Sequence, residues 1–176
     1  MSELTNALEA YFYVVEAKEK VLEGIEEIED AVYSLSKHYT FAVRDIHGMH
    51  DNVIEAFGSV GKAYRVFNDA LDSLYHAEDK LLSDIATLLK EIKAYIEGKG
   101  IKVEEIGITE MLGESRVFPR AVVVVSGIDD EKRKELANEV RERFGISTPF
   151  LSVITGEHKY KLLTPESIES RLKVRR

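Results

Sequence analysis

Apolar residues recur every three or four positions along the first hundred residues, in two stretches that share one heptad register. The first stretch runs from Leu4 to Ile46, and the same frame resumes at Val53. An apolar repeat kept over this length is typical of helices that pack along each other as a coiled coil. We call these heptad positions the seam. They predict two long helices, at about residues 3–47 and 53–97.

Glycines mark the ends of these two stretches. Gly48 lies in the break between them, and Gly98 and Gly100 follow the second stretch. Glycine commonly ends helices because it adopts the left-handed conformation without steric cost. We therefore predict an antiparallel hairpin with its tip at 47–52, in which facing seam residues have numbers that sum to 99 or 100. Weak helix formers at 34–40 leave open a break there, which would give three helices.

Two charged residues of the seam, Lys18 and Glu78, fall in neighbouring layers of this hairpin. A buried polar residue at a seam costs stability but can fix the register and the number of partners. We predict that Lys18 and Glu78 set the register. The alternative is that both long side chains bend out into solvent.

The pattern changes to that of strands after residue 100. Loose alternation at 103–111 predicts one strand, and a β-branched run at 121–125 within residues 117–126 predicts a second. Residues 150–155 predict a third strand. The first two strands can form a hairpin, and a helix between the second and third would make that pair parallel.

Two helices are expected among these strands. Asp129 or Asp130 can cap a helix that ends before Gly145, and Pro165 suits the first turn of a last helix. The order is β-β-α-β-α. The expected fold class is α+β: a long antiparallel coiled-coil hairpin over residues 1–98, followed by a small mixed α/β domain over residues 101–176.

Charge is distributed unevenly between these two parts. Residues 1–100 hold 10 Lys/Arg against 19 Asp/Glu, whereas residues 101–176 hold 14 against 13. An acidic hairpin repels phosphates, so nucleic acid is not expected along it. The basic positions near the C-terminus could engage phosphates, although ordinary terminal charges fit them too; they are Lys159, Lys161, Lys173, Arg175 and Arg176. The mixed charges of the helix at 130–144 predict a solvated surface with i,i+4 ion pairs.

Composition narrows the class of protein. The chain has no cysteine, 44% hydrophobic residues and 32% charged residues. It begins without a basic region followed by an apolar core, and it has no apolar run long enough for a membrane span. We expect a cytoplasmic protein with no disulfides or thiolate zinc site. The high charge, with few methionines, suggests a heat-adapted source.

The candidate chemistry is sparse. At the hairpin tip, His47, His50 and Asp51 have the ligand types of a divalent metal site, although solvated loop histidines fit the same residues. The loop at 156–158 follows a predicted strand, where residues of a ligand site often lie. No nucleophile with a matching base is evident. No catalytic residue is expected, and no cofactor apart from a divalent ion at the tip.

The leading hypothesis is a non-enzymatic scaffold or adaptor that associates through its hairpin, as a homodimer or with another helical protein. Apolar residues beside the seam make a wider stripe than one pair of helices can bury, which favours a four-helix assembly. The alternatives are a ligand- or nucleic-acid-binding module that the hairpin dimerises, and a metal-binding protein. The expected interface residues are Val53, Phe57, Val60, Tyr64, Phe67, Leu71, Leu74, Leu81 and Ile85.

Overall fold

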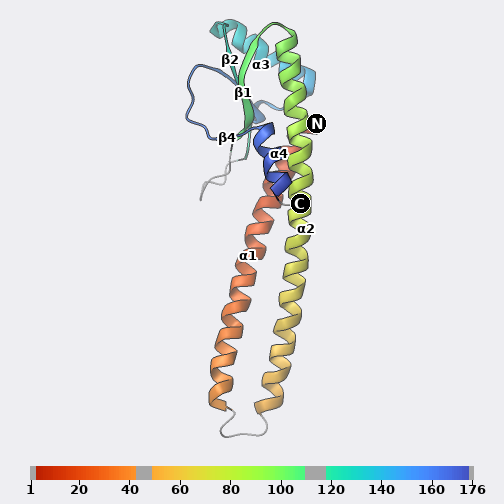
Figure 1. Cartoon of the computed structure of the whole chain (residues 1–176), viewed down its shortest axis with the longest axis vertical. Coiled ribbons are helices and arrows are strands. Elements are labelled where there is room, and N and C mark those ends of the chain that lie inside the picture. The colour runs from red at the N-terminus through yellow and green to blue at the C-terminus, as the bar shows by residue number, and fades with distance from the viewer. Residues whose placement is uncertain (1–2, 43–48, 110–117, 175–176) are drawn as a thin grey trace. The chain divides into compact units, whose positions relative to one another are not determined.

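Two long helices, α1 (Glu3–Ala42) and α2 (Met49–Gly98), form the first part of the chain (Figure 1). The computed structural model describes the backbone of residues 3–42, 49–109 and 118–174, and the side chains of these residues except 38–53. The predicted helices are confirmed. α1 continues through 34–40, so the first arm does not break there. α2 begins four residues earlier than the pattern predicts.

The chain divides into two compact units. The hairpin unit is Val14–Ala77, and the sheet unit combines Met1–Tyr13 with Glu78–Arg176. Each long helix therefore contributes one end to the sheet unit and the rest to the hairpin unit. The boundary at 98–101 between a hairpin and an α/β domain stays a prediction from the sequence.

Four strands make the sheet, in the order β3-β2-β1-β4. β1 (Lys102–Thr109) pairs antiparallel with both β2 (Ala121–Ser126) and β4 (Leu162–Leu163), and β2 pairs parallel with β3 (Leu151–Thr155). The predicted antiparallel first pair and parallel second pair are both confirmed. The two-residue strand β4 is an addition that the sequence did not suggest.

Local signals fix the helices between and after these strands. α3 (Asp130–Phe144) begins where the Asp129 carboxylate accepts a hydrogen bond from the Lys132 backbone N–H at 2.8 Å. It ends at Gly145, whose φ of 63° is left-handed. A short 3₁₀ turn at Thr148–Phe150 leads into β3, and α4 (Pro165–Val174) starts at its proline as expected.

The core of the sheet unit lies between the sheet and the helix ends. All five residues from Ala121 to Val125 are at most 5% exposed, because β2 is an inner strand. Tyr95 of α2 meets Phe144 of α3 edge to face at 5.7 Å between ring centroids. The buried Thr5 hydroxyl accepts a hydrogen bond from the Ser147 backbone N–H. These contacts join the end of α2 to α3, and the start of α1 to the segment that leads into β3.

Among the residues that the structure describes, no helix combines the length and the apolar character that crossing a membrane would require.

Candidate functional site

The hairpin unit leaves most of its apolar side chains in contact with solvent. Among the side chains described in this unit, only Ile25 is buried, at 9% exposed. A helix pair covers one stripe on each helix, so apolar residues beside that stripe stay uncovered. We call the exposed large apolar residues of the unit the hairpin surface: Leu22, Val32, Tyr33, Ile54, Tyr64 and Val66.

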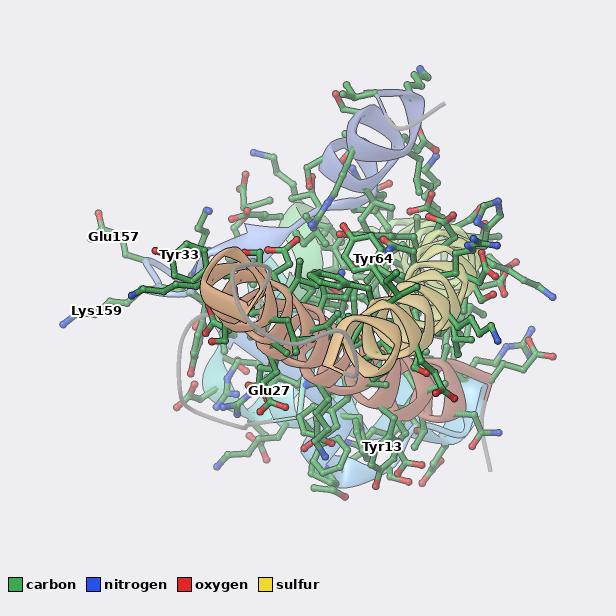
Figure 2. The ribbon with its side chains drawn as sticks, turned by 90° about the horizontal axis from the view of Figure 1, so that it is seen from below. Tyr13, Glu27, Tyr33, Tyr64, Glu157 and Lys159 are labelled. Atoms are coloured by element: carbon green, nitrogen blue, oxygen red, sulfur yellow. The ribbon has the colours of Figure 1, made fainter. Side chains whose placement is uncertain are left out.

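Both helices contribute to the hairpin surface. Tyr33 of α1 is 67% exposed, and Val66 and Tyr64 of α2 are 65% and 40% exposed. Figure 2, which views the helix pair along its length, shows Tyr33 and Tyr64 on the same side and Glu27 on the other.

The nine predicted interface residues divide between the two units. Leu81 and Ile85 belong to the sheet unit, where Ile85 is fully buried. Tyr64 is exposed, and the side chain of Val53 lies outside the described residues. The other five are half-buried in the hairpin unit: Phe57, Val60, Phe67, Leu71 and Leu74. Their role in association stays a prediction.

The side chains of Lys18 and Glu78 are both at least partly shielded from solvent. Lys18 is half-buried, and its Nζ lies 4.9 Å from the centroid of the Tyr75 ring. Such a contact between a cation and an aromatic face is attractive. Glu78, in the sheet unit, is only 1% exposed, so its carboxylate does not bend into solvent. That the two residues set the register stays a prediction.

The facing pairs within the hairpin unit differ from the predicted register. Gly24 lies against the Phe67 ring, which fills the space that a Cβ at this position would need. This pair and the contact of Lys18 with Tyr75 have residue numbers that sum to 91 and 93 rather than 99 or 100. The shift arises because α2 begins earlier than predicted, which moves the centre of the hairpin toward the N-terminus.

The side chains of the proposed metal ligands at the tip lie outside the described part of the structure. His47 is outside the described residues, and His50 and Asp51 are described only as backbone within α2. Among the described residues, no group of three or more His, Cys, Asp or Glu side chains is placed to hold a metal ion. A metal site at the tip stays a prediction.

A hollow of about 600 Å³, which we call the sheet hollow, lies where the parallel strands β2 and β3 end. Crevices at the carboxyl ends of parallel strands are frequent ligand sites in open sheets. The hollow is acidic, with one histidine, and Figure 2 shows Glu157 extending away from the chain there. Its lining residues are Glu104, Glu105, Val124, Val125, Ser126, Gly156, Glu157 and His158.

His158 is the central side chain of the sheet hollow. It is 15% exposed, and its Nε2 lies 2.9 Å from Oε2 of Glu105. Its Nδ1 is buried without a hydrogen-bond partner in the described structure. The His158 ring stacks on the Tyr160 ring, with 6.2 Å between the two ring centroids. The Arg120 guanidinium lies 5.7 Å from the centroid of the same Tyr160 ring.

A second carboxylate of the hollow is held in its ionised form. The Ser126 hydroxyl donates a hydrogen bond to Glu104 at 2.6 Å, and the Lys102 ammonium lies 2.9 Å from the same oxygen. The hydroxyl, and secondarily Lys102, lower the pKa of Glu104 below its usual value. Two carboxylates beside one histidine suit a ligand with hydrogen-bond donors or positive charge.

The sequence pointed to part of this hollow and missed the rest. The position of residues 156–158 after a strand was a usable signal. Glu105 was not found, because it lies 53 residues from His158 in the chain and the two meet through the arrangement of β1, β2 and β3 in the sheet.

Comparisons with models of protein families, with curated proteins and with solved structures find no match to this chain. The hairpin surface and the sheet hollow are therefore the features that support a proposal of function.

Proposed function

We propose that the protein is a non-enzymatic scaffold or adaptor that associates with a second copy of itself through the hairpin surface. The observation that carries this proposal is that the hairpin unit buries a single described side chain, Ile25. Burial of apolar area is the main force that stabilises packed helices in water. A second hairpin packed on the first would form a four-helix bundle and cover the exposed apolar side chains.

The charges of the hairpin unit favour a second copy that runs in the opposite direction. The half away from the tip, residues 14–30 and 69–77, holds nine Asp/Glu and two Lys/Arg. The half at the tip, residues 31–68, holds three Asp/Glu and four Lys/Arg. With the two tips at opposite ends, each acidic half meets a nearly neutral one, whereas copies in the same direction bring the two acidic halves together and repel each other.

The proposal is tested by placing a charge on the hairpin surface. Val66→Glu should weaken self-association by more than about 100-fold, because each copy loses about 1.5–3 kcal/mol of apolar burial and the dimer contains two copies. Val174→Glu is the matched control, since Val174 is an 85% exposed valine of α4, outside the hairpin unit. Light scattering after gel filtration measures the mass of both variants across a concentration series. Equal association of the two variants would contradict a role for the hairpin surface.

The sheet hollow supports a second candidate, a ligand-binding module that the hairpin dimerises. The observation that favours it is His158, which is half-buried beside Glu105 and has a buried Nδ1 without a hydrogen-bond partner in the described structure. The acidic lining argues for a small cationic or hydrogen-bond-donating ligand over nucleic acid. A thermal-shift survey of small amines and metabolites should find one that stabilises the protein but not His158→Ala. A survey in which both proteins respond alike would reject the site.

The remaining features of this proposal come from composition. We propose a cytoplasmic location, which the lack of cysteine supports, and a heat-adapted source, which the 32% of charged residues supports. A divalent ion at the tip remains a proposal for His47, His50 and Asp51. Metal analysis of the purified protein and of His47→Ala tests it, and purified protein without bound metal would reject it.

A further inference from the structure

The outer edge of β3 is held by two arginines. β3 is an edge strand of the described sheet, paired only with β2. Arg133 of α3 donates a hydrogen bond from Nη1 to the Val153 carbonyl at 2.9 Å, and Arg141 donates from Nη2 to the Leu151 carbonyl at 3.1 Å. These two carbonyls are two residues apart on the strand, so both point to the same side. That side is the one on which another strand would pair.

A groove of about 370 Å³ separates α3 from this edge, and we call it the α3–β3 groove. Its lining contains three cations and no carboxylate: the residues are Arg133, Lys134, Ala137, Asn138, Arg141, Ser152, Val153 and Ile154. The Nε of Arg141 is buried without a hydrogen-bond partner in the described structure. Arg133 also donates from Nε to the Asp130 carboxylate at 3.1 Å, and Arg141 donates from Nη1 to the Asn138 amide oxygen at 3.2 Å. The groove therefore combines strand-edge acceptors, a net positive charge and one unsatisfied donor.

We propose that the α3–β3 groove binds an extended acidic segment of another protein, which adds to the sheet as a strand beside β3. Docking would exchange hydrogen bonds without leaving acceptors unpaired. Backbone N–H groups of the incoming strand would donate to the Leu151 and Val153 carbonyls, and the guanidinium groups released would bind carboxylates of that strand. Charge-assisted bonds from arginine to carboxylate are stronger than bonds to a neutral carbonyl.

The geometry also selects the occupant. Two carbonyls separated by two strand residues are about 6.6–6.8 Å apart, which matches carboxylates on alternate residues of a docked strand. A second copy of β3 does not fit, because it would bring its own Arg133 and Arg141 to the same edge and contains no acidic residue in Leu151–Thr155. This inference is independent of the hairpin surface and would give an adaptor its target-binding site.

Binding of a synthetic peptide tests the proposal. The probe is the capped heptapeptide VEVEVEV, and the matched control is VQVQVQV. The acidic peptide should bind at least about tenfold more tightly and slow hydrogen exchange at the Val153 amide, which points to the same side as its carbonyl. Equal affinity of the two peptides, or binding that leaves the Val153 amide unchanged, would overturn the proposal. Inorganic phosphate that displaces the acidic peptide completely at equal concentration would also overturn it, by showing a simple anion site.

Variants of α3 locate the binding. Arg133→Gln and Arg141→Gln should each weaken VEVEVEV binding at least about tenfold, whereas Arg143→Gln, at an exposed arginine outside the groove, should change it less than about twofold. Because Arg133 and Arg141 also hold β3, Lys134→Gln provides a test that leaves the fold intact. The Lys134 ammonium makes no hydrogen bond or ion pair with the described part of the chain. Its loss should therefore weaken binding of VEVEVEV and leave binding of VQVQVQV unchanged. Unchanged binding of both peptides by Lys134→Gln would contradict the site.

Discussion

Replacing Gly24 by alanine tests how the two helices of the hairpin unit face each other. A Cβ at Gly24 would overlap the Phe67 ring, whereas a Cβ at Gly61 would meet nothing within 4 Å. Alanine in a helix interior is about 1 kcal/mol more favourable than glycine, so Gly61→Ala should raise the free energy of unfolding by about that amount. At Gly24 the same gain is opposed by overpacking, which costs about 1–3 kcal/mol. Gly24→Ala should therefore leave stability unchanged or lower it by up to about 2 kcal/mol.

Urea unfolding followed by circular dichroism, at one chain concentration for all variants, measures this difference. A double-mutant cycle with Phe67→Leu assigns the overlap to the ring, because a smaller side chain at 67 should restore much of the alanine gain at 24. If Gly24→Ala stabilises the protein as much as Gly61→Ala does, Phe67 does not pack on Gly24. The register deduced for the hairpin unit would then be wrong.

Three further substitutions test the sheet unit. Asp129→Ala removes the carboxylate that caps α3 and should lower the free energy of unfolding by about 1 kcal/mol, measured by thermal unfolding. Gly145→Ala forces a side chain onto a left-handed residue and should cost about 1 kcal/mol in the same assay; an unchanged melting temperature would contradict this cap. Lys90 lowers the pKa of Glu169 below its ordinary value of 4.5, so this pair stabilises the fold above that pH and stops doing so as the pH falls through the lowered pKa. Glu169→Gln should therefore lose less stability than the unchanged protein between about pH 6 and about pH 3, and identical pH profiles would show that the pair contributes nothing.

Local sequence signals predicted the elements of the sheet unit well. Asp129, Gly145 and Pro165 each act within one turn of the helix that they begin or end, so their positions in the chain were sufficient. The β-branched run in β2 predicted a strand, and because the run leaves no polar face for solvent it suits the inner position that β2 occupies. β4, with two residues, is too short to show any alternation.

Contacts between residues far apart in the chain were harder to predict from the sequence. The pair of Glu105 and His158 requires the strand register, including the irregularity between Val103 and Glu105. The arginines of α3 were interpreted as part of a solvated surface, because bonds from side chains to backbone carbonyls leave no trace in the charge pattern. Arg133 and Arg141 therefore became visible as a possible site once β3 was placed at the edge of the sheet.

The hairpin register shows how a strong pattern can still leave the pairing open. A heptad repeat specifies which residues of each helix face a partner, but shifting one helix by a whole repeat preserves that pattern. The register then depends on where the turn lies. Glycine at 48 suggested one centre, and the earlier start of α2 at Met49 gives another.

Sedimentation equilibrium of the full chain tests the central claim most directly. If two hairpins cover each other's exposed apolar side chains, the mass in solution should be twice 19.9 kDa at micromolar concentration and above. Because the proposed contact is apolar, and the pairing of acidic halves with nearly neutral ones is a secondary contribution, the dimer should persist at high salt. A single species of 19.9 kDa at every concentration tested would contradict the account.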